Sequence, residues 1–290
     1  MNYLRYFGLR EPPFGMTPDT SFFYPCRSTQ EALNTLLVAV ENGEGFIKIT
    51  GEVGTGKTLL CRKFLGMLDA RAWASAYIPN PNLEPRTLML ALAEELRASV
   101  DPGADQHRVV RAINRALLDL ARNRRRIVLC MDESQAMPLD TLEMVRLLTN
   151  LETEKRKLLH VVLFGQPELD QKLATSYIRQ LRQRITFQHD LKALGEDEVG
   201  AYFAHRMAVA GYTGPLMLAG PVCRSLHRAS RGVPRLVNIL AHKSLLLLYG
   251  EGGRQLEARH IRAAAMDTPA SVQPRRWWQW PGLGLSRAAK

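Results

Sequence analysis

The sequence predicts an α/β protein: a parallel sheet with helices on both faces, followed by a small all-helical domain. Two observations lead to this fold class. Up to residue 192, short apolar segments typical of buried strands alternate with amphipathic helical segments, as in a parallel sheet that is covered on both sides. Beyond residue 192 the strand pattern stops, and the segments between glycines have helical periodicity.

The elements are expected in the following order along the chain. Strands are expected at 46–50, 74–79, 127–131, 160–165 and 185–190. Helices of the α/β domain are expected at 28–41, from Thr58 onward, at 85–99, at 105–122 with Asp105 as a cap, near Pro138 and after Gly165. The later helices are expected at 196–210, 215–229, 233–249 and 257–267.

These elements divide the chain into four expected parts. Residues 1–27 form an arm rich in aromatic residues and proline, which we expect to pack onto the α/β domain. The α/β domain covers 28–192 and the helical domain 193–268. Residues 269–290 form a tail rich in Trp and Arg, which we expect to be poorly ordered.

Composition restricts the class of protein without selecting a partner. The 290 residues are 46% hydrophobic and 23% charged, as in ordinary globular proteins. The net charge of +11 is compatible with nucleic acid, anionic lipid or an acidic protein. The four cysteines lack metal-ligand spacing, and the sequence has neither a signal-peptide pattern nor an apolar run long enough to span a membrane. We therefore expect a cytoplasmic protein.

The most specific local pattern is G-x-x-x-x-G-K-[ST], which residues 51–58 match as GEVGTGKT. An expected strand precedes this phosphate loop and an expected helix follows it, so the context favours nucleotide binding over an ordinary glycine-rich turn. Lys57 is expected to reach the β- and γ-phosphates of ATP, and Thr58 to bind Mg²⁺. The expected nucleotide contacts are Gly51, Glu52, Val53, Gly54, Thr55, Gly56, Lys57, Thr58 and Leu59.

An acidic pair, Asp132 and Glu133, follows the third expected strand. The carboxyl ends of parallel strands line the ligand crevice, so Asp132 is expected to meet the magnesium ion. Glu133 is then placed to orient and deprotonate the water that attacks the γ-phosphate. The alternative, a solvated turn or helix cap, is less favoured because a phosphate loop lies upstream.

Three further polar residues are candidates for the same reaction. Gln166 follows the fourth expected strand and could sense the γ-phosphate, or could simply open a turn. Arg235 begins a helix of the helical domain and could fold over the nucleotide; as a surface residue it would sit where the helix dipole disfavours a cation. Arg184 is preferred over Arg179 and Arg182 as an arginine that reaches a neighbouring subunit's nucleotide, although all three would be solvated in a monomer.

Motifs along nearly the whole chain carry a resemblance to one family. They are YFGLREPPF at 6–14, TPD at 17–19, EAL at 31–33, TGEVGTGKT at 50–58, DE at 132–133, GQPEL at 165–169, RQL and QRI within 179–185, HR at 205–206 and GVPRLVN at 232–238. The chain resembles AAA+ ATPases, and more narrowly the secretion and pilus-biogenesis ATPases grouped with general secretion pathway protein A and the MSHA pilus biogenesis protein M. The opening motif and GQPEL are more specific than the phosphate loop.

The resemblance implies an ATPase that forms a homo-oligomer, commonly a ring such as a hexamer, with a helical lid domain. It places Asp132, Glu133, Gln166 and Arg235 in the roles given above, and it implies inner-membrane components of a pilus or secretion machine as partners. Thr29 departs from the histidine that the family often has before the EAL motif. The sequence also lacks the membrane span and peptidoglycan-binding domain of the longer members, which favours the short pilus type.

Other functions remain open at this stage. A DNA-dependent helper ATPase of transposition or replication type is favoured by the net charge and by Arg122, Arg124, Arg125 and Arg126, although a solvated helix end accounts for that cluster more simply. A nucleotide-switched scaffold without turnover is a third reading. The tail segment 275–280 could contact the inner membrane peripherally, dock on a partner or have no role.

Overall fold

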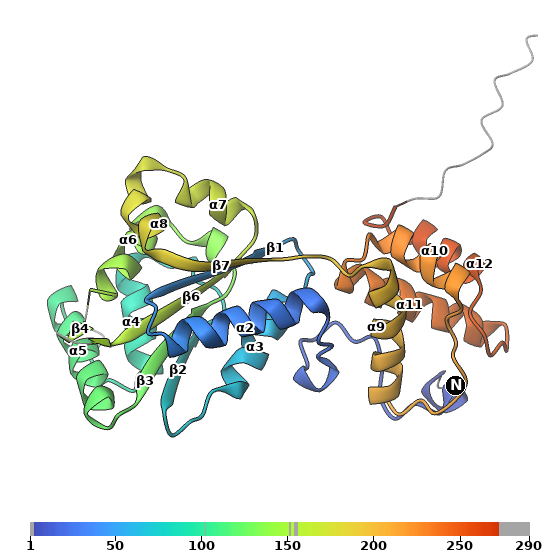
Figure 1. Cartoon of the computed structure of the whole chain (residues 1–290), viewed down its shortest axis with the longest axis horizontal. Helices are drawn as coiled ribbons and strands as arrows, with labels where there is room; N and C mark the ends of the chain where they lie inside the picture. Colours follow the sequence, from blue (N-terminus) through green and yellow to red (C-terminus); the bar gives the residue numbers. More distant parts are fainter. Residues whose placement is uncertain (1–2, 102, 151, 154–155, 273–290) are drawn as a thin grey trace, which may run out of the picture.

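The computed structural model describes residues 3–101, 103–150, 152–153 and 156–272. The chain folds into two halves, a sheet with its covering helices and a group of helices, which lie side by side in Figure 1. Residues 273–290, which are most of the expected tail and the part to which the expectation of poor order mainly applies, lie outside the described residues. Within those residues, every helix is too short or too polar to span a bilayer.

The sheet contains five parallel strands, as the sequence predicts. In spatial order they are β2 (Trp73–Ile78), β3 (Arg126–Met131), β6 (Leu159–Gly165), β1 (Phe46–Gly51) and β7 (Ile185–Leu191). Every residue of β1 and β6 is buried, as in a parallel sheet that is covered on both faces, including the polar Lys48, Thr50 and His160. Since β3, β6 and β1 are neighbours, the loops after them meet at one edge of the sheet.

Helices cover both faces of the sheet, because successive side chains of a strand point to opposite sides. On one face, α2 (Arg27–Glu41) and α3 (Lys57–Met67) pack against Ile47, Val128 and Val162. On the other face, helices pack against the alternate residues Leu129 and Val161. These helices are α4 (Pro85–Glu95), α5 (Gln106–Arg122), α6 (Leu139–Leu148), α7 (Glu168–Leu173) and α8 (Arg179–Arg184).

The helical half contains the four helices that the sequence predicts. They are α9 (Glu196–Val209), α10 (Gly220–Ser230), α11 (Pro234–Gly250) and α12 (Ala258–Met266). Helix α10 begins five residues later than expected, because Pro221 is tolerated in the first turn of a helix and not in its interior. Helix α4 ends earlier than expected, since Arg97 has a left-handed φ of 54°.

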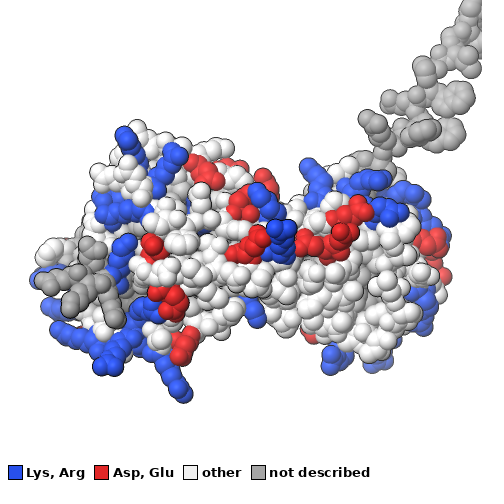
Figure 2. Space-filling view, viewed as in Figure 1, with Lys and Arg blue, Asp and Glu red and all other residues white. Residues whose placement is uncertain are grey.

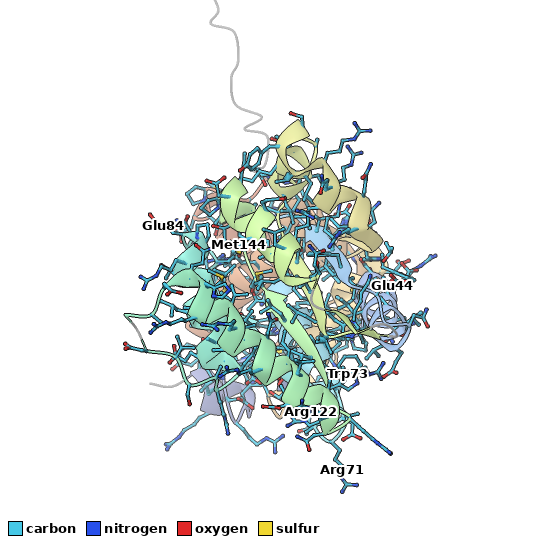
Figure 3. The ribbon with its side chains drawn as sticks, turned by 90° about the vertical axis from the view of Figure 1, so that its left-hand side faces the viewer. Glu44, Arg71, Trp73, Glu84, Arg122 and Met144 are labelled. Atoms are coloured by element: carbon cyan, nitrogen blue, oxygen red, sulfur yellow. The ribbon has the colours of Figure 1, made fainter. Side chains whose placement is uncertain are left out.

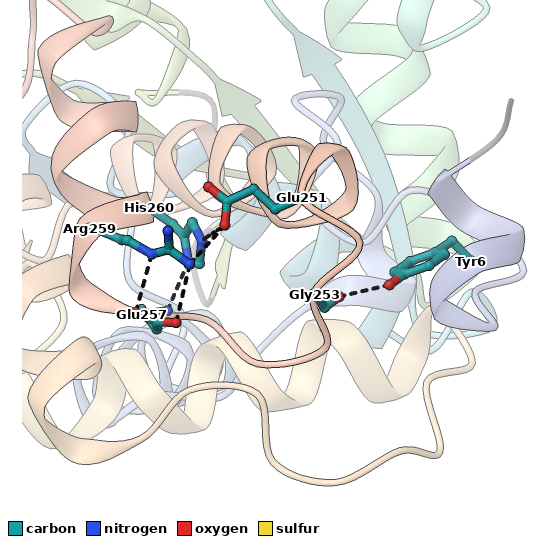
Figure 4. A network of polar contacts seen from close by, with 6 residues as sticks. All are labelled: Tyr6, Glu251, Gly253, Glu257, Arg259 and His260. Carbon is teal, nitrogen blue, oxygen red and sulfur yellow. Dashed lines mark hydrogen bonds and ion pairs between the residues drawn. The ribbon is translucent and has the colours of Figure 1, made fainter.

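The N-terminal arm packs mainly onto the helical half. It also contacts the α/β domain as expected, because Phe23 joins the apolar cluster around α2 and α3 and Pro18 O accepts from Arg62 Nη1 at 2.8 Å. Phe7, Phe14 and Phe22 are buried in the same apolar cluster as the residues of α9 and α11. The rings of Phe14 and Phe203 lie 4.9 Å apart, and Tyr6 Oη donates to Gly253 O at 3.1 Å (Figure 4). The helices α2 to α8 already cover the sheet, which leaves the helical half as the apolar surface that the arm buries.

Four short features of the described chain were not expected. Helix α1 (Tyr3–Phe7) and a 3₁₀ turn (Thr20–Phe22) give the arm regular structure. Helix α8 forms from the Arg-rich segment, and β4 (Glu152–Thr153) pairs with β5 (Arg156–Lys157) in a small antiparallel ribbon. Segments this short give weak periodicity in a sequence.

Gly232, just before α11, packs against the segment that joins β7 to α9. Its carbonyl accepts from Leu194 N at 2.9 Å, and its φ is +70°. A Cβ atom at this position would lie 2.0 Å from Leu194 O. Only glycine combines that backbone conformation with that close approach.

We expect Gly232→Ala to lower the free energy of unfolding by about 2–4 kcal/mol, because it adds a backbone clash to a left-handed conformation. Chemical denaturation measures this. The control is Gly66→Ala in α3, where a Cβ meets no atom within 4 Å, so that change should be neutral or stabilising by up to about 1 kcal/mol. Equal stability of the two variants would contradict the proposed constraint.

Candidate active site

A pocket of about 250 Å³ lies where the carboxyl edge of the sheet meets the helical half. The phosphate loop contributes Val53, Gly54, Gly56, Lys57, Thr58 and Leu59 to its lining. The arm, α9 and α11 supply most of the remaining lining residues. Glu133, Gln166 and Arg235 also line it, so the fold brings together most of the residues that the sequence singles out.

The phosphate loop is tightly wound around the Lys57 side chain. Lys57 is 5% exposed, and its Nζ donates to Gly51 O at 2.7 Å and to Glu52 O at 3.0 Å. Burial lowers the pKa of this ammonium group, and the carboxylates of Glu133 and Asp132 offset part of the fall. The first N–H groups of α3 have no acceptor within the helix, so the loop presents both a cation and free donors, as an anion site requires.

The hydroxyl of Thr58 and the carboxylate of Asp132 are in direct contact. Thr58 Oγ1 donates to Asp132 Oδ2 at 2.6 Å, and Tyr77 Oη lies 3.5 Å from the same oxygen. Asp132 is 2% exposed. Burial raises the pKa of Asp132, partly offset by the hydrogen bond from Thr58. Burial and the nearby Asp132 also raise the pKa of Tyr77 to about 12, so its hydroxyl keeps its proton.

Glu133 is held by two glutamine side chains. Gln135 Nε2 donates to Glu133 Oε2 at 2.6 Å, and Gln166 Nε2 donates to the same oxygen at 3.1 Å. Gln135 Oε1 in turn accepts from Gln166 N at 3.0 Å, which ties the loop after β3 to the loop after β6. The sequence analysis did not identify Gln135 as a site residue, although its position two residues after Glu133 could have indicated it.

The backbone and the charge state of Glu133 fit a specialised position. Its φ is 52°, in the left-handed region that non-glycine residues rarely adopt. Partial burial raises the pKa of Glu133. The hydrogen bonds from Gln135 and Gln166, together with the charge of Lys57, lower it by more, so the pKa is below the usual value. Glu133 is therefore ionised at neutral pH and can accept a proton.

Helix α11 lies directly on the phosphate loop. Arg235 N, in the first turn of α11, donates to Gly54 O at 3.1 Å. A Cβ at Gly54, whose φ is +85°, would lie 2.6 Å from Arg235 Cβ. The Arg235 side chain is exposed and lines the pocket, as expected of a residue that covers a nucleotide.

A buried polar chain forms the part of the pocket wall that α9 and α11 contribute. Arg206 is 5% exposed; its Nε donates to Pro13 O at 2.6 Å and its Nη1 to Tyr202 Oη at 3.2 Å. Tyr202 Oη donates to Asn238 Oδ1 at 2.9 Å. The arm residues 15–19 complete this wall. The TPD and HR motifs, which were noted in the sequence without a role, both lie here.

Arg184 is outside the pocket. Its Nη1 donates to Arg146 O at 3.3 Å and to Thr149 Oγ1 at 3.2 Å, at the end of α6. Arg179 and Arg182 are exposed on α8. None of the three reaches the pocket of its own chain, which leaves the expected contact with another subunit as a prediction.

The basic cluster at the end of α5 is largely used within the protein. Arg122 pairs with Asp119 at 3.1 Å, and Arg125 donates to Trp73 O at 2.9 Å. Arg126 pairs with Glu41 at 2.6 Å and stacks on Trp73 at 4.0 Å. Figure 3 shows Arg122, Trp73 and Arg71 at one end of this face. Arg125 and Arg126 are therefore structural, whereas Arg122 and Arg124 remain exposed.

The fold and this pocket together define a P-loop nucleotide-binding protein with a helical second part. Residues 40–173 match the family model of the AAA domain. The chain is also 39% identical over 278 residues to general secretion pathway protein A of Aeromonas hydrophila, an alignment that covers 96% of this chain and 50% of that protein. Residues 40–173 are thus similar to an AAA domain, and the chain is similar to general secretion pathway protein A, of which it spans about half the length.

Solved structures show the same AAA+ fold. The ORC2 protein of Aeropyrum pernix in ADPNP–ADP complexes matches with a TM-score of 0.64 at 16% identity, over 87% of this chain and 72% of that chain. ORC1 of Aeropyrum pernix in complex with DNA matches at 0.61 and 18% identity, over 89% and 69%. The RuvB Holliday junction branch migration motor of Thermotoga maritima matches at 0.53 and 15% identity, over 82% and 68%. At these identities the likeness extends to the fold alone.

Because the pKa of Asp132 is raised, we expect the stability of the folded chain to depend on pH. The folded chain holds a proton there at pH values where the unfolded chain has lost it, so the free energy of unfolding falls as pH rises through the window above the usual aspartate pKa. Asp132→Asn removes the buried charge and keeps an acceptor for Thr58. Without nucleotide at pH 7 its Tm should rise, by about 2–4 °C for each kcal/mol recovered.

Thermal melts from pH 3 to pH 8 measure this difference, which should shrink as the pH falls through the same window. The control is Asp119→Asn, an exposed side chain, which should change stability by no more than about 0.5 kcal/mol. A lower Tm for Asp132→Asn at pH 7 would show that the carboxylate stabilises the fold.

Proposed function

We propose that the protein is an ATPase that hydrolyses ATP to ADP and phosphate. One observation carries this proposal: the phosphate loop, Glu133, Gln166 and Arg235 line a single pocket between the two halves. Asp132 lies directly behind that pocket, in contact with Thr58. These are the types of group that phosphoryl transfer to water requires: donors for the phosphates, a base for the water and a cation for developing charge.

The chain's own residues have distinct roles in this reaction. The N–H groups of the phosphate loop and Lys57 Nζ bind the phosphates, once Lys57 leaves Gly51 O and Glu52 O. Glu133 accepts a proton from the attacking water through Oε1, while Gln135 and Gln166 hold Oε2. Gln166 is placed to contact the γ-phosphate, and Arg235 carries a positive charge from the helical half to the same phosphates.

The contact between Thr58 and Asp132 suits a magnesium ion. Mg²⁺ prefers oxygen ligands and uses few of them from the protein, and a hydroxyl and a buried carboxylate oxygen 2.6 Å apart offer that donor set. Thr58 and Asp132 would hold the ion, Asp132 directly or through water. When bound, Mg²⁺ neutralises charge on the β- and γ-phosphates.

We further propose that the protein works as a homo-oligomeric ring, of a size such as a hexamer. The arginines at 179–184 reach no nucleotide in their own chain, and a second subunit's pocket is the site where one of them could stabilise charge. Arg184 remains the first choice. In the single subunit its hydrogen bonds to Arg146 O and Thr149 Oγ1 hold α8 against the end of α6.

The biological setting that we propose is assembly or remodelling of a pilus or secretion machine at the inner membrane, from its cytoplasmic side. Its support is the 39% identity to general secretion pathway protein A. Inner-membrane components of such a machine would be the partners. The MSHA pilus type is the narrower form of this proposal, and it rests on the motifs quoted in the sequence.

A DNA-dependent helper ATPase is the second candidate. The observation that favours it is the outer face of α5, where Arg108, Arg111 and Arg115 are exposed at helical spacing. Proteins of similar fold are seen with DNA. It ranks second because most of the cluster at Arg122–Arg126 is engaged within the protein.

We expect Glu133→Gln to bind ATP within about threefold of the unmodified protein and to lose turnover by about 10²–10⁴-fold, because the amide cannot accept the proton. Nucleotide binding by fluorescence and phosphate release measure the two quantities. Glu168→Gln, a nearby exposed carboxylate outside the pocket lining, should turn over within about twofold. Unchanged turnover by Glu133→Gln would remove that residue from the mechanism.

The two candidate functions differ in their response to DNA. We expect turnover of the purified protein to be indifferent to double-stranded DNA at both low and moderate salt. Stimulation by DNA that weakens steeply as salt rises would place the helper ATPase first, because contacts with phosphates release counterions.

A further inference from the structure

A second hollow, the largest of those described, lies in the helical half and shares no residue with the nucleotide pocket. It is a groove of about 740 Å³ between α10 and α12. Arg224 and Arg228 from α10 and Arg262 from α12 line it, and all three are exposed. Figure 2 shows basic side chains gathered on this part of the helical half.

The positive charge of this groove is only partly neutralised by its surroundings. Three acids of the helical half are already engaged: Glu251 and Glu257 bind Arg259 at 2.9 and 3.2 Å (Figure 4), and Asp267 binds Lys243 at 2.8 Å. Glu196 and Asp197 of α9 lie near Cys223, next to Arg224, and their charge offsets part of the positive charge at that end of α10. Across the described ranges, no carboxylate forms an ion pair with Arg224, Arg228 or Arg262. Residues 273–290 add arginines and contain neither Asp nor Glu.

The floor of the groove is apolar. Ala229, Ile261 and Ala265 are buried beneath the arginines. Val272, which is 43% exposed, lies at the edge, and its N–H donates to Ala229 O at 2.9 Å. An arginine rim over an apolar floor matches a ligand that joins a phosphate to hydrocarbon, whereas a nucleic acid backbone needs no such floor.

We propose that this groove binds the phosphate headgroup of an anionic membrane lipid and docks the helical half on a bilayer surface. The inference rests on the proposed function for its setting at a membrane. Guanidinium groups bind phosphate with paired hydrogen bonds, and the glycerol region would cover the apolar floor. Just after Val272 the sequence continues with Arg275, Arg276 and three tryptophans, residue types that favour the membrane interface.

Sedimentation of the full chain with vesicles tests the proposal. The vesicles are phosphatidylcholine alone and phosphatidylcholine with about one third phosphatidylglycerol. We expect binding only to the anionic vesicles. The variant Arg224→Gln, Arg228→Gln, Arg262→Gln should bind them about a hundredfold more weakly, since each basic residue near an anionic surface contributes about fivefold.

A matched control separates this groove from net charge. Arg108→Gln, Arg111→Gln, Arg115→Gln removes the same charge from α5, at the opposite end of the molecule in Figure 1. It should bind anionic vesicles within about twofold of the unmodified chain, because charges beyond the Debye length of about 10 Å are screened. Equal losses in both triple variants, or no loss in the groove variant, would overturn the proposal. A thermal melt of each variant checks that it is folded.

Two further arms identify other sources of binding. If Arg275→Gln, Arg276→Gln abolishes vesicle binding and the groove variant does not, the tail alone contacts lipid and the groove proposal is wrong. If the groove variant binds vesicles normally but loses affinity for a fluorescent DNA duplex, the groove is a nucleic acid site instead. All arms are measured without nucleotide, so a failure of the proposed ATPase activity leaves this test intact.

Discussion

The contact between the phosphate loop and the first turn of α11 is the constraint on which the rest of the structure depends. Arg235 N has no acceptor within its own helix, and Gly54 O supplies one at 3.1 Å. Only a glycine in the left-handed conformation lets the helix approach this closely. This hydrogen bond holds α11 against the phosphate loop and sets the place from which the Arg235 side chain enters the pocket.

This arrangement places every group that would respond to a γ-phosphate within one connected set. Lys57 is bonded to carbonyls of its own loop, and Glu133 is bonded to Gln135 and Gln166. Binding of a polyphosphate must exchange the Lys57 bonds for phosphate contacts in the loop that also supports α11. Phosphate binding in this loop would therefore be coupled to the orientation of the helical half.

Sequence reasoning recovered what periodicity and short motifs encode. The five strands and their parallel sense were predicted from the apolar segments that alternate with helices. The position of the site, at the loops after β1, β3 and β6, was predicted from the rule that ligands bind at the carboxyl ends of parallel strands. It could not recover long-range partners. The arm's attachment depends on which apolar surface is left uncovered, and the role of Gln135 depends on the distance between two loops 31 residues apart. Neither quantity is local.

The arm and the helical half share one apolar core, although the whole sheet half separates them in sequence. Tyr6 meets Gly253, 247 positions later, and Arg206 meets Pro13, 193 positions earlier. A ribosome adding 5–20 residues per second needs about 12–50 s to cover the longer interval. During that time the aromatic residues of the arm have no native partner, while the sheet half between them can already fold. The arm is therefore made before the sheet half but reaches its place only after the helical half has been made.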